Sequence, residues 1–197
     1  MSVLDIFQKR RSQYALTNQL PITVPHLQQL IAQCIKQAPS AFNMQSARVV
    51  LLLADKHRQL WHLTSKILRD QVPLSQQAHT CAKINSFAAA YGTILYFEDQ
   101  PVVQQMQEQF SLYKDNFPVW AQQANGMLQF AIWCALAEQN IGASLQHYNP
   151  LIDEAVARTF DIPVEWQLVA QMPFGQILSP AASKTFVPME KRFWVKQ

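Results

Sequence analysis

Apolar and polar residues recur along this chain with two different periods, and each period predicts a different kind of element. Between residues 23 and 38, five apolar residues from Leu27 to Ile35 follow the i, i+3, i+4, i+7, i+8 spacing of one helix face. Thr23 is a suitable N-cap, with Pro25 in the first turn. Ala38 precedes a proline and therefore avoids the helical region, so the helix ends there.

The same pattern predicts further helices and three strands. Helices are expected over residues 3–9, 55–70, 75–90, 101–114, 118–140 and 150–160. The last is opened by Asn149 as N-cap and Pro150 as the first helical residue. Apolar runs predict buried strands at Val49–Ala54 and Thr93–Phe97. A third strand is expected at Gln167–Met172, and residues 143–148 stay open between a short strand and a loop. We expect a layered α+β or α/β chain forming one domain over residues 1–197.

The helix expected over residues 120–139 is apolar around nearly its whole circumference from Met127 onward. Such a helix must be covered on every side. It is either the central core helix of a monomer or an interface helix of a homodimer, and we favour the homodimer because a chain of this size has little material to surround it.

Composition narrows the class of protein. Apolar residues make up 49% and charged residues 15% of the 197 residues, which is typical of a globular chain. The formal charge of +3 is too small and too scattered to indicate a nucleic-acid surface. With no apolar run near 18 residues and no signal-type N-terminus, we expect a cytoplasmic protein without a membrane partner. Cys34, Cys81 and Cys134 are expected to be buried thiols.

The four glycines exclude several nucleotide-binding motifs. They lie at least sixteen residues apart, so neither G-x-G-x-x-G nor a P-loop can be built from them, and G-x-S-x-G is absent. A phosphate would therefore have to be bound by cationic side chains and helix ends. The histidines show no metal-ligand spacing, so no metal site is expected.

Three polar segments stand out, at residues 10–12, 39–46 and 188–193. Each alone would be an ordinary solvated segment, but together with other motifs they resemble the nitroreductase family of FMN-dependent enzymes, in particular its short bacterial and fungal members. The matching pieces are Arg10-Arg11-Ser12, Pro39 to Ser46, Lys83 with Phe87, Tyr91 to Asp99, Phe117-Pro118 with Trp120, Gly142 to Asn149, Met172 to Gly175, and Glu190 to Phe193.

The resemblance implies a three-layer α+β fold with a central, mostly antiparallel sheet flanked by helices. It also implies a homodimer with exchanged C-terminal tails and an FMN site shared between the subunits. In such a site Arg10, Ser12 and Arg192 would hold the phosphate by charge-assisted hydrogen bonds. Arg11 would reach the pyrimidine side of the flavin, and Lys83 would face its N1/O2 edge and tune it.

The resemblance assigns further residues by segment. The partner subunit would lend Pro39, Ser40, Ala41, Asn43 and Gln45. The strand behind the ring, with a backbone N–H toward flavin N5, would be His147, Tyr148 and Asn149. Phe117 and Trp120 would line the substrate pocket. Tyr14 stands where many relatives have a basic residue, and Lys184 or Lys191 could take over that phosphate contact.

The activity so implied is ping-pong hydride transfer through flavin N5, from NADH or NADPH to a nitroaromatic or quinone. The flavin performs the chemistry, so no catalytic side chain is required. The alternative is a flavin carrier or regulatory protein without general reductase turnover. The sequence does not choose between NADH and NADPH, nor does it name the physiological acceptor.

Overall fold

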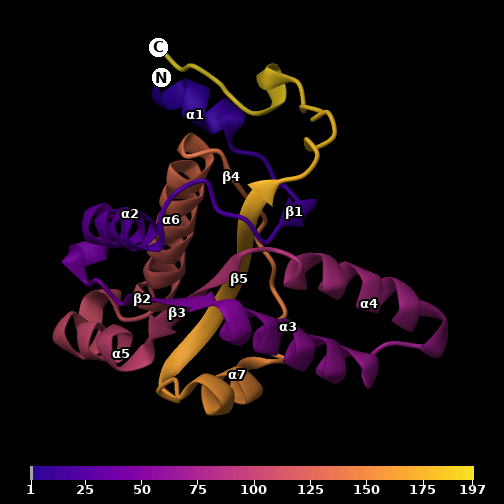
Figure 1. Cartoon of the computed structure of the whole chain (residues 1–197). Helices are drawn as coiled ribbons and strands as arrows, with labels where there is room; N and C mark the ends of the chain where they lie inside the picture. Colours follow the sequence, from indigo (N-terminus) through magenta and orange to yellow (C-terminus); the bar gives the residue numbers. More distant parts are fainter. Residues whose placement is uncertain (1) are drawn as a thin grey trace.

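The computed structural model describes residues 2–197 and places an antiparallel sheet between two layers of helices (Figure 1). The strands are β1 (Leu16–Thr17), β2 (Ala47–Leu53), β3 (Gly92–Asp99), β4 (Ile141–Ala143) and β5 (Trp166–Ile177). Their order is β1-β5-β3-β2, and β4 also pairs with β5; all of these pairs are antiparallel. The predicted antiparallel three-layer α+β fold is therefore confirmed.

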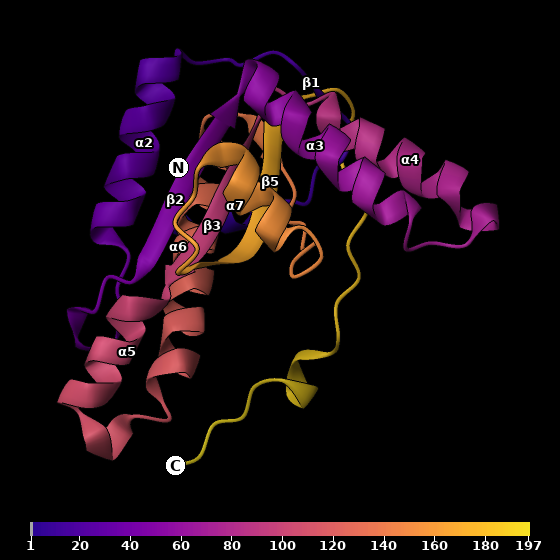
Figure 2. The same ribbon diagram turned by 90° about the horizontal axis from the view of Figure 1, so that it is seen from below.

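The helices cover both faces of this sheet (Figures 1 and 2). The α-helices are α1 (Val3–Lys9), α2 (Val24–Gln37), α3 (Ala54–Arg69), α4 (Leu74–Ala88), α5 (Gln100–Gln109), α6 (Phe117–Glu138) and α7 (Asp153–Phe160). Short 3-10 turns are η1 (Ala41–Asn43), η2 (Ser111–Tyr113) and η3 (Met189–Lys191).

The side chains of β3 alternate between two hydrophobic cores. Ile94 and Tyr96 point into a core shared with α2 and α6, whereas Leu95 and Phe97 point into a core shared with α3, α4 and α7. Because successive strand residues face opposite sides, a strand buried on both faces appears as a continuous apolar run. β2 differs from this expectation: it lies at the edge of the sheet, and most of its residues are only half-buried.

The best-predicted helices carry their own start and stop signals. α1 begins with a capping box in which Ser2 accepts from the Asp5 amide and Asp5 accepts from the Ser2 amide. α2 begins after Thr23, which accepts from the His26 amide, and ends before Pro39. These two helices match the sequence prediction closely.

Several predicted boundaries were wrong. Asn149 and Pro150 do not open α7: their peptide bond is cis, a turn follows, and the helix begins at Asp153, where two carboxylates occupy its first turn. β5 continues through Pro173 and Gly175 to Ile177, although both residue types usually weaken a strand. In the segment 143–148, which the sequence left open, Ala143 is the last residue of β4 (Ile141–Ala143). The helix predicted to reach residue 114 is shorter, because α5 ends at Gln109 and η2 follows.

The long helix α6 has two different faces. Leu128, Ile132 and Leu136 are buried against the chain's own sheet. Met127 and Phe130 are 46% and 41% exposed, and the Phe130 ring lies 5.0 Å from that of Phe7 on α1. The chain itself therefore covers only part of this apolar helix, and an uncovered patch remains between α1 and α6.

The α3–α4 hairpin projects from one side of the sheet (Figures 1 and 2). Its base is fixed by a buried hydrogen-bond group: Trp61 Nε1 donates to Thr93 Oγ1 at 2.9 Å, and His57 Nδ1 lies 2.8 Å from the same oxygen. His57 Nε2 faces the Ala88 carbonyl at 3.2 Å, so Nε2 carries the proton and Nδ1 accepts from the Thr93 hydroxyl. The hairpin is thereby held to β3.

After β5 the chain leaves the sheet as an extended tail (Figure 2). Large apolar side chains of this tail are exposed, with Phe186 at 73% and Trp194 at 69%. The three cysteines are free; Cys134 is buried as expected, but Cys34 and Cys81 are only half-buried. Within residues 2–197, no helix has the length and apolar character needed to cross a membrane.

Candidate flavin site

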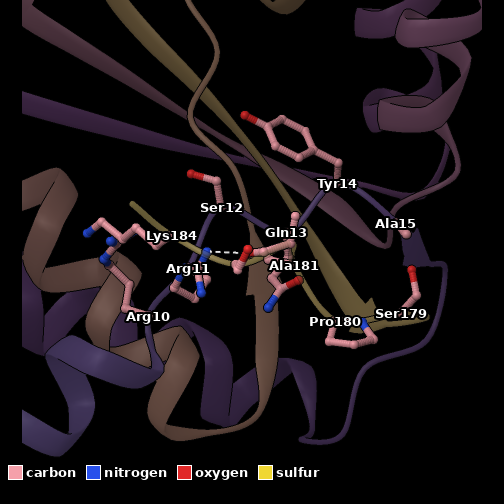
Figure 3. A pocket seen from close by; sticks show the side chains of 12 residues that line it. Arg10, Arg11, Ser12, Gln13, Tyr14, Ala15, Ser179, Pro180, Ala181 and Lys184 are labelled. Atoms are coloured by element: carbon pink, nitrogen blue, oxygen red, sulfur yellow. Dashed lines mark hydrogen bonds between the residues drawn. The ribbon is translucent and has the colours of Figure 1, made fainter. Parts of the chain in front are cut away.

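A cavity of about 490 Å³ lies between the segment that follows α1 and the start of the C-terminal tail (Figure 3). It is lined by residues 10–15 on one side and 179–184 on the other. The first segment is fixed in place because Ser12 forms a bridge with Ala143 of β4 and the Gln13 amide donates to the Ala143 carbonyl at 2.9 Å. The sheet thus positions the predicted Arg10-Arg11-Ser12 motif in a cavity.

Both arginines of this motif are held in fixed orientations. The Arg10 guanidinium lies over the Trp133 ring, 4.4 Å from its centroid, which is a cation–π contact. The Nε atom of Arg10 is buried and has no hydrogen-bond partner. Arg11 donates from Nη2 to the Ala182 carbonyl at 2.6 Å and so ties the tail to the cavity wall (Figure 3).

The cavity concentrates positive charge without compensation. Arg10, Arg11 and Lys184 all line it, and no carboxylate does. Among the ion pairs within residues 2–197, none involves these three cations. Half-buried Arg10 and Arg11 and exposed Lys184, beside the Ser12 hydroxyl, form a site for an anion with several acceptor oxygens, and a phosphate has that chemistry. The residues present therefore fit the phosphate of FMN.

The sequence left open whether Lys184 or Lys191 contacts the phosphate, and the structure places these two lysines in different regions. Lys184 lines the same cavity as Arg10 and Arg11. Lys191 lies in η3, in the exposed part of the tail, together with Arg192. Within one chain, Lys184 and not Lys191 therefore lies beside Arg10 and Arg11.

The segment His147–Asn149 lies along β5 and is fixed by one buried side chain, Gln171. Gln171 accepts from the Tyr148 amide through Oε1 at 2.8 Å and donates to Asn149 Oδ1 at 3.3 Å. The amide of Tyr148 is thus already engaged, whereas the His147 amide has no hydrogen-bond partner within the described residues. His147 is the better placed of the two to offer a backbone N–H to a ligand.

Tyr148 joins this segment to the α3–α4 hairpin. Its ring packs 6.0 Å from that of Trp61 and 6.5 Å from that of Phe87 on α4. Burial raises the pKa of Tyr148 to about 12, so the phenol stays neutral. Lys83 lies on α4 one turn before Phe87, is exposed, and lies outside the cavity that contains Arg10.

The loop at residues 39–46 lies elsewhere on the same chain. Pro39, Ser40 and Gln45 line a separate hollow of about 150 Å³ next to α6. In Figures 1 and 2 the end of α2, from which this loop continues, and the region of β1 lie at opposite ends of the sheet. Within one chain the loop and the Arg10 cavity therefore do not form one site.

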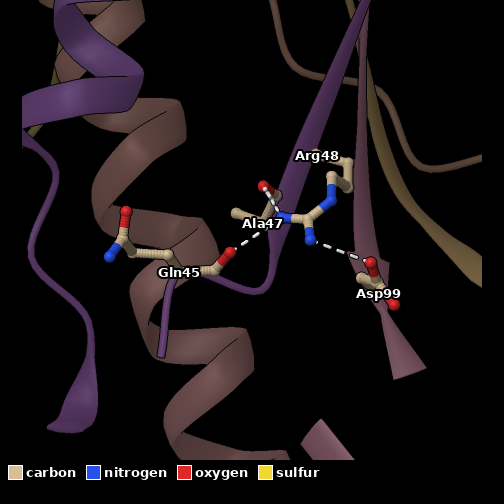
Figure 4. A network of polar contacts seen from close by, with 4 residues as sticks. All are labelled: Gln45, Ala47, Arg48 and Asp99. Carbon is tan, nitrogen blue, oxygen red and sulfur yellow. Dashed lines mark hydrogen bonds and ion pairs between the residues drawn. The ribbon is translucent and has the colours of Figure 1, made fainter. Parts of the chain in front are cut away.

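This loop is strained and tightly anchored. Phe42, Asn43 and Gln45 each have a φ of 53°, a left-handed conformation that costs roughly 1–3 kcal/mol in a non-glycine residue. Ser40 Oγ accepts from the Gln45 amide at 2.9 Å. Arg48 donates to the Gln45 carbonyl at 2.7 Å and pairs with the Asp99 carboxylate at 2.9 Å (Figure 4).

The strain directs the Phe42 side chain into a cluster of aromatic rings. Its ring lies 4.6 Å from that of Phe110, 5.5 Å from that of Phe117 and 6.1 Å from that of Trp120, and it is 52% exposed. Phe117, expected in the substrate pocket, is fully buried and packs against the Phe42 ring from inside the protein. Trp120 is half-buried and, with Phe42, presents an aromatic surface.

Several residues of these sites were missed at the sequence level. Trp133, Gln171 and Phe42 act through distant partners, so no local spacing identifies them. The left-handed backbone at Phe42 has no sequence signal either, because glycine or asparagine is the usual residue there.

Comparison with known proteins agrees with this geometry. The nitroreductase family model matches residues 7–176, and the chain belongs to that family. It is 42% identical to the nitroreductase CinD of Lactococcus lactis, solved with chloramphenicol and with 4-nitrophenol, over the whole of both chains at a TM-score of 0.91.

Two further relatives extend the comparison. HBN1 of Saccharomyces cerevisiae, named as a nitroreductase, is 33% identical over 186 residues, which is 93% of this chain and 92% of HBN1. A nitroreductase of Desulfitobacterium hafniense solved with bound FMN shares the fold, with a TM-score of 0.71 at 19% identity over 98% of this chain and 97% of that one.

Proposed function

We propose that this protein is an FMN-dependent oxidoreductase that uses NADH or NADPH to reduce a nitroaromatic or quinone. The main observation behind the proposal is that Arg10, Arg11 and Lys184 line one cavity and no carboxylate lines it with them. Family membership and an FMN-bound relative of the same fold support it. Bound FMN would supply the two-electron chemistry, accepting hydride from the nicotinamide and passing it to the acceptor.

The residues of the chain would bind and orient the cofactor. Arg10, oriented by Trp133, and Lys184 would hold the phosphate together with Ser12, while Arg192 would approach it from the tail. Arg11 would stay on the pyrimidine side. The His147 amide would donate toward N5, and Lys83 would stabilise negative charge at the N1/O2 edge.

The structures of one relative favour a nitroaromatic as the acceptor. CinD was solved with 4-nitrophenol and with chloramphenicol, both of which carry a nitroaryl group. Phe42 and Trp120 would provide the surface on which such planar rings stack.

We further propose that the site is completed by a second copy of the chain. Pro39, Ser40, Ala41, Asn43 and Gln45 would then come from the partner subunit, because within one chain this loop and the Arg10 cavity lie apart. The uncovered apolar patch between α1 and α6 and the exposed apolar tail favour the same homodimer, with the tails exchanged. Free cysteines suit a cytoplasmic location.

Three measurements on the purified protein test this function. We expect a yellow protein that releases FMN on denaturation, and we expect its flavin to bleach when NADH or NADPH is added without oxygen. Turnover with 4-nitrophenol-type compounds and quinones should follow. A yellow protein that neither nicotinamide reduces would instead be a flavin carrier, and a colourless protein that binds no FMN would contradict both.

A further inference from the structure

A buried carboxyl group lies beneath the loop at residues 40–46 and has no part in the proposed chemistry. Glu98, near the end of β3, is 0% exposed. Its Oε1 accepts from Asn125 Nδ2 of α6 at 2.7 Å, and Asn125 Oδ1 in turn accepts from Gln129 Nε2 at 2.7 Å. The two amides thus form a chain of donors that ends at the carboxyl group.

The other carboxyl oxygen faces the loop. Glu98 Oε2 is buried without a hydrogen-bond partner, and so is Oγ of Ser46, which is 1% exposed. The Ser46 hydroxyl lies close enough to favour the ionised carboxyl, although the two atoms do not meet in hydrogen-bond geometry. Ser46 also lines the hollow next to Pro39, Ser40 and Gln45.

The backbone connects the same residues. The Asp99 amide donates to the Ser46 carbonyl at 3.0 Å, and Arg48 joins the Gln45 carbonyl to the Asp99 carboxylate (Figure 4). The end of β3 therefore holds the end of the loop through two separate contacts. A loop with three left-handed residues needs such anchors to keep its conformation.

We propose that Glu98 is a positioning residue: through Ser46 it holds the loop 40–46 in the conformation that meets the flavin of the partner subunit. This inference rests on the proposed function, because it is there that the loop reaches FMN. The ionised carboxyl would draw in the Ser46 hydroxyl by a charge-assisted hydrogen bond, and the protonated form would hold it less tightly.

The surroundings of Glu98 allow this group to titrate. Burial raises the pKa of its carboxyl, and the nearby Ser46 hydroxyl and the hydrogen bond from Asn125 oppose that rise. Arg48 on β2 is the cation that faces it and lowers the pKa, while Asp99 on β3 raises it. The groups that face it from α6 and from the loop are the uncharged Asn125, which Gln129 holds in turn, and Ser46.

The test compares the wild type with Glu98→Gln, which keeps the acceptor for Asn125 but cannot ionise. Two readouts are followed on the protein as purified, from about pH 5 to about pH 8. One is the hydrogen-exchange protection factor of the Gln45 and Asp99 amides; the other is FMN affinity from fluorescence quenching. We expect both to increase together in the wild type, at least about threefold, and to stay flat and low in E98Q.

A matched control is Asp153→Asn on α7, another carboxyl whose pKa burial raises and which has an unpartnered oxygen. It should behave like the wild type. Ser46→Ala, which removes the connecting hydroxyl, should behave like E98Q and serves as the milder variant if E98Q does not fold.

The outcomes separate the two proposals. Equal pH dependence in E98Q and wild type, no pH dependence in the wild type, or a wild-type profile in S46A would each overturn the role of Glu98. A protein that binds no FMN would contradict the proposed function instead, and the protection factors would still show whether Glu98 holds the loop.

Discussion

At the scale of single residues, the candidate site depends on cations that form no ion pair within residues 2–197. Arg10 is the clearest case, because Trp133 fixes its guanidinium from one side and leaves its hydrogen-bond donors to a ligand. Arg48, by contrast, is paired with the Asp99 carboxylate. The arrangement thus favours ligand binding over a structural role.

Arg10→Ala should therefore weaken FMN binding without unfolding the chain. A charge-assisted hydrogen bond contributes roughly 1.5–3 kcal/mol, which corresponds to about a 10- to 150-fold loss of affinity. Flavin content after extensive dialysis and a fluorescence titration would measure it. Arg58→Ala, which removes an exposed arginine of α3, is the control; equal flavin loss in both variants would refute the assignment.

Lys83 is expected to tune the flavin and not to anchor it. Lys83→Met keeps most of the aliphatic stem and removes the charge that favours the reduced, anionic ring. We expect retained FMN and a midpoint potential more negative by on the order of 30 mV, with slower reduction by the nicotinamide. Lys66→Met on α3 serves as control. An unchanged midpoint in K83M would place Lys83 outside the site.

At the scale of elements, the parts that could be predicted are those with local signals. The capping box of α1, the Thr23 cap of α2 and the apolar run of β3 determine these elements from neighbouring residues alone. The two-residue strand β1 has no such pattern, because it forms only where the sheet offers Ile177 and Gln176 as partners.

The same distinction applies to the site. The motif at residues 10–12 was identifiable from its residue types, and the cavity contains all of it. Its companions Trp133 and Lys184 come from α6 and the tail, more than 100 residues away in sequence, and only the fold brings them together.

The attachment of α3 to β3 should make stability depend on pH. Burial lowers the pKa of His57 below its ordinary value of 6.5. The unfolded chain therefore binds more protons than the folded one in mildly acidic solution, so stability falls as the pH drops below about 6.5. Comparing unfolding free energies of wild type and His57→Gln between about pH 5 and 8 should show a smaller acid loss in the variant.

The exposed His62 on the same helix provides the control for that experiment. His62→Gln should keep the full acid dependence. If H62Q and H57Q lose stability in parallel with the wild type, the buried His57–Thr93 contact is not the origin of the effect.

At the scale of the whole molecule, one face of α6 packs in the core of the chain and the other is available for association with a second copy. The buried Ile132 belongs to the chain's own core, so a charge there would test folding and not association. Phe130, on the uncovered face, is the informative position. We therefore keep the proposal that α6 is an interface helix only for the face that carries Phe130.

Phe130→Glu should leave the chain folded, convert the proposed dimer to a monomer, and lower its FMN content, because the proposed site needs both subunits. Sedimentation, circular dichroism and flavin absorbance would follow these three properties. Val164→Glu, at an 86% exposed position before β5, should change none of them. A folded F130E monomer that keeps its flavin would contradict a shared site.

The projecting α3–α4 hairpin has a further consequence for the rate at which substrates arrive. Five lysines and arginines and only two aspartates lie between residues 54 and 88, so this one element accounts for the +3 charge that the sequence suggested was scattered. A local positive field attracts the anionic nicotinamide dinucleotide from solution, whereas it does not attract a neutral quinone. Raising the salt from about 0.02 to 0.5 M shortens the range of that field. We expect kcat/KM for the nicotinamide to fall and kcat/KM for the quinone to stay constant, so that ionic strength decides which half of the catalytic cycle limits the enzyme.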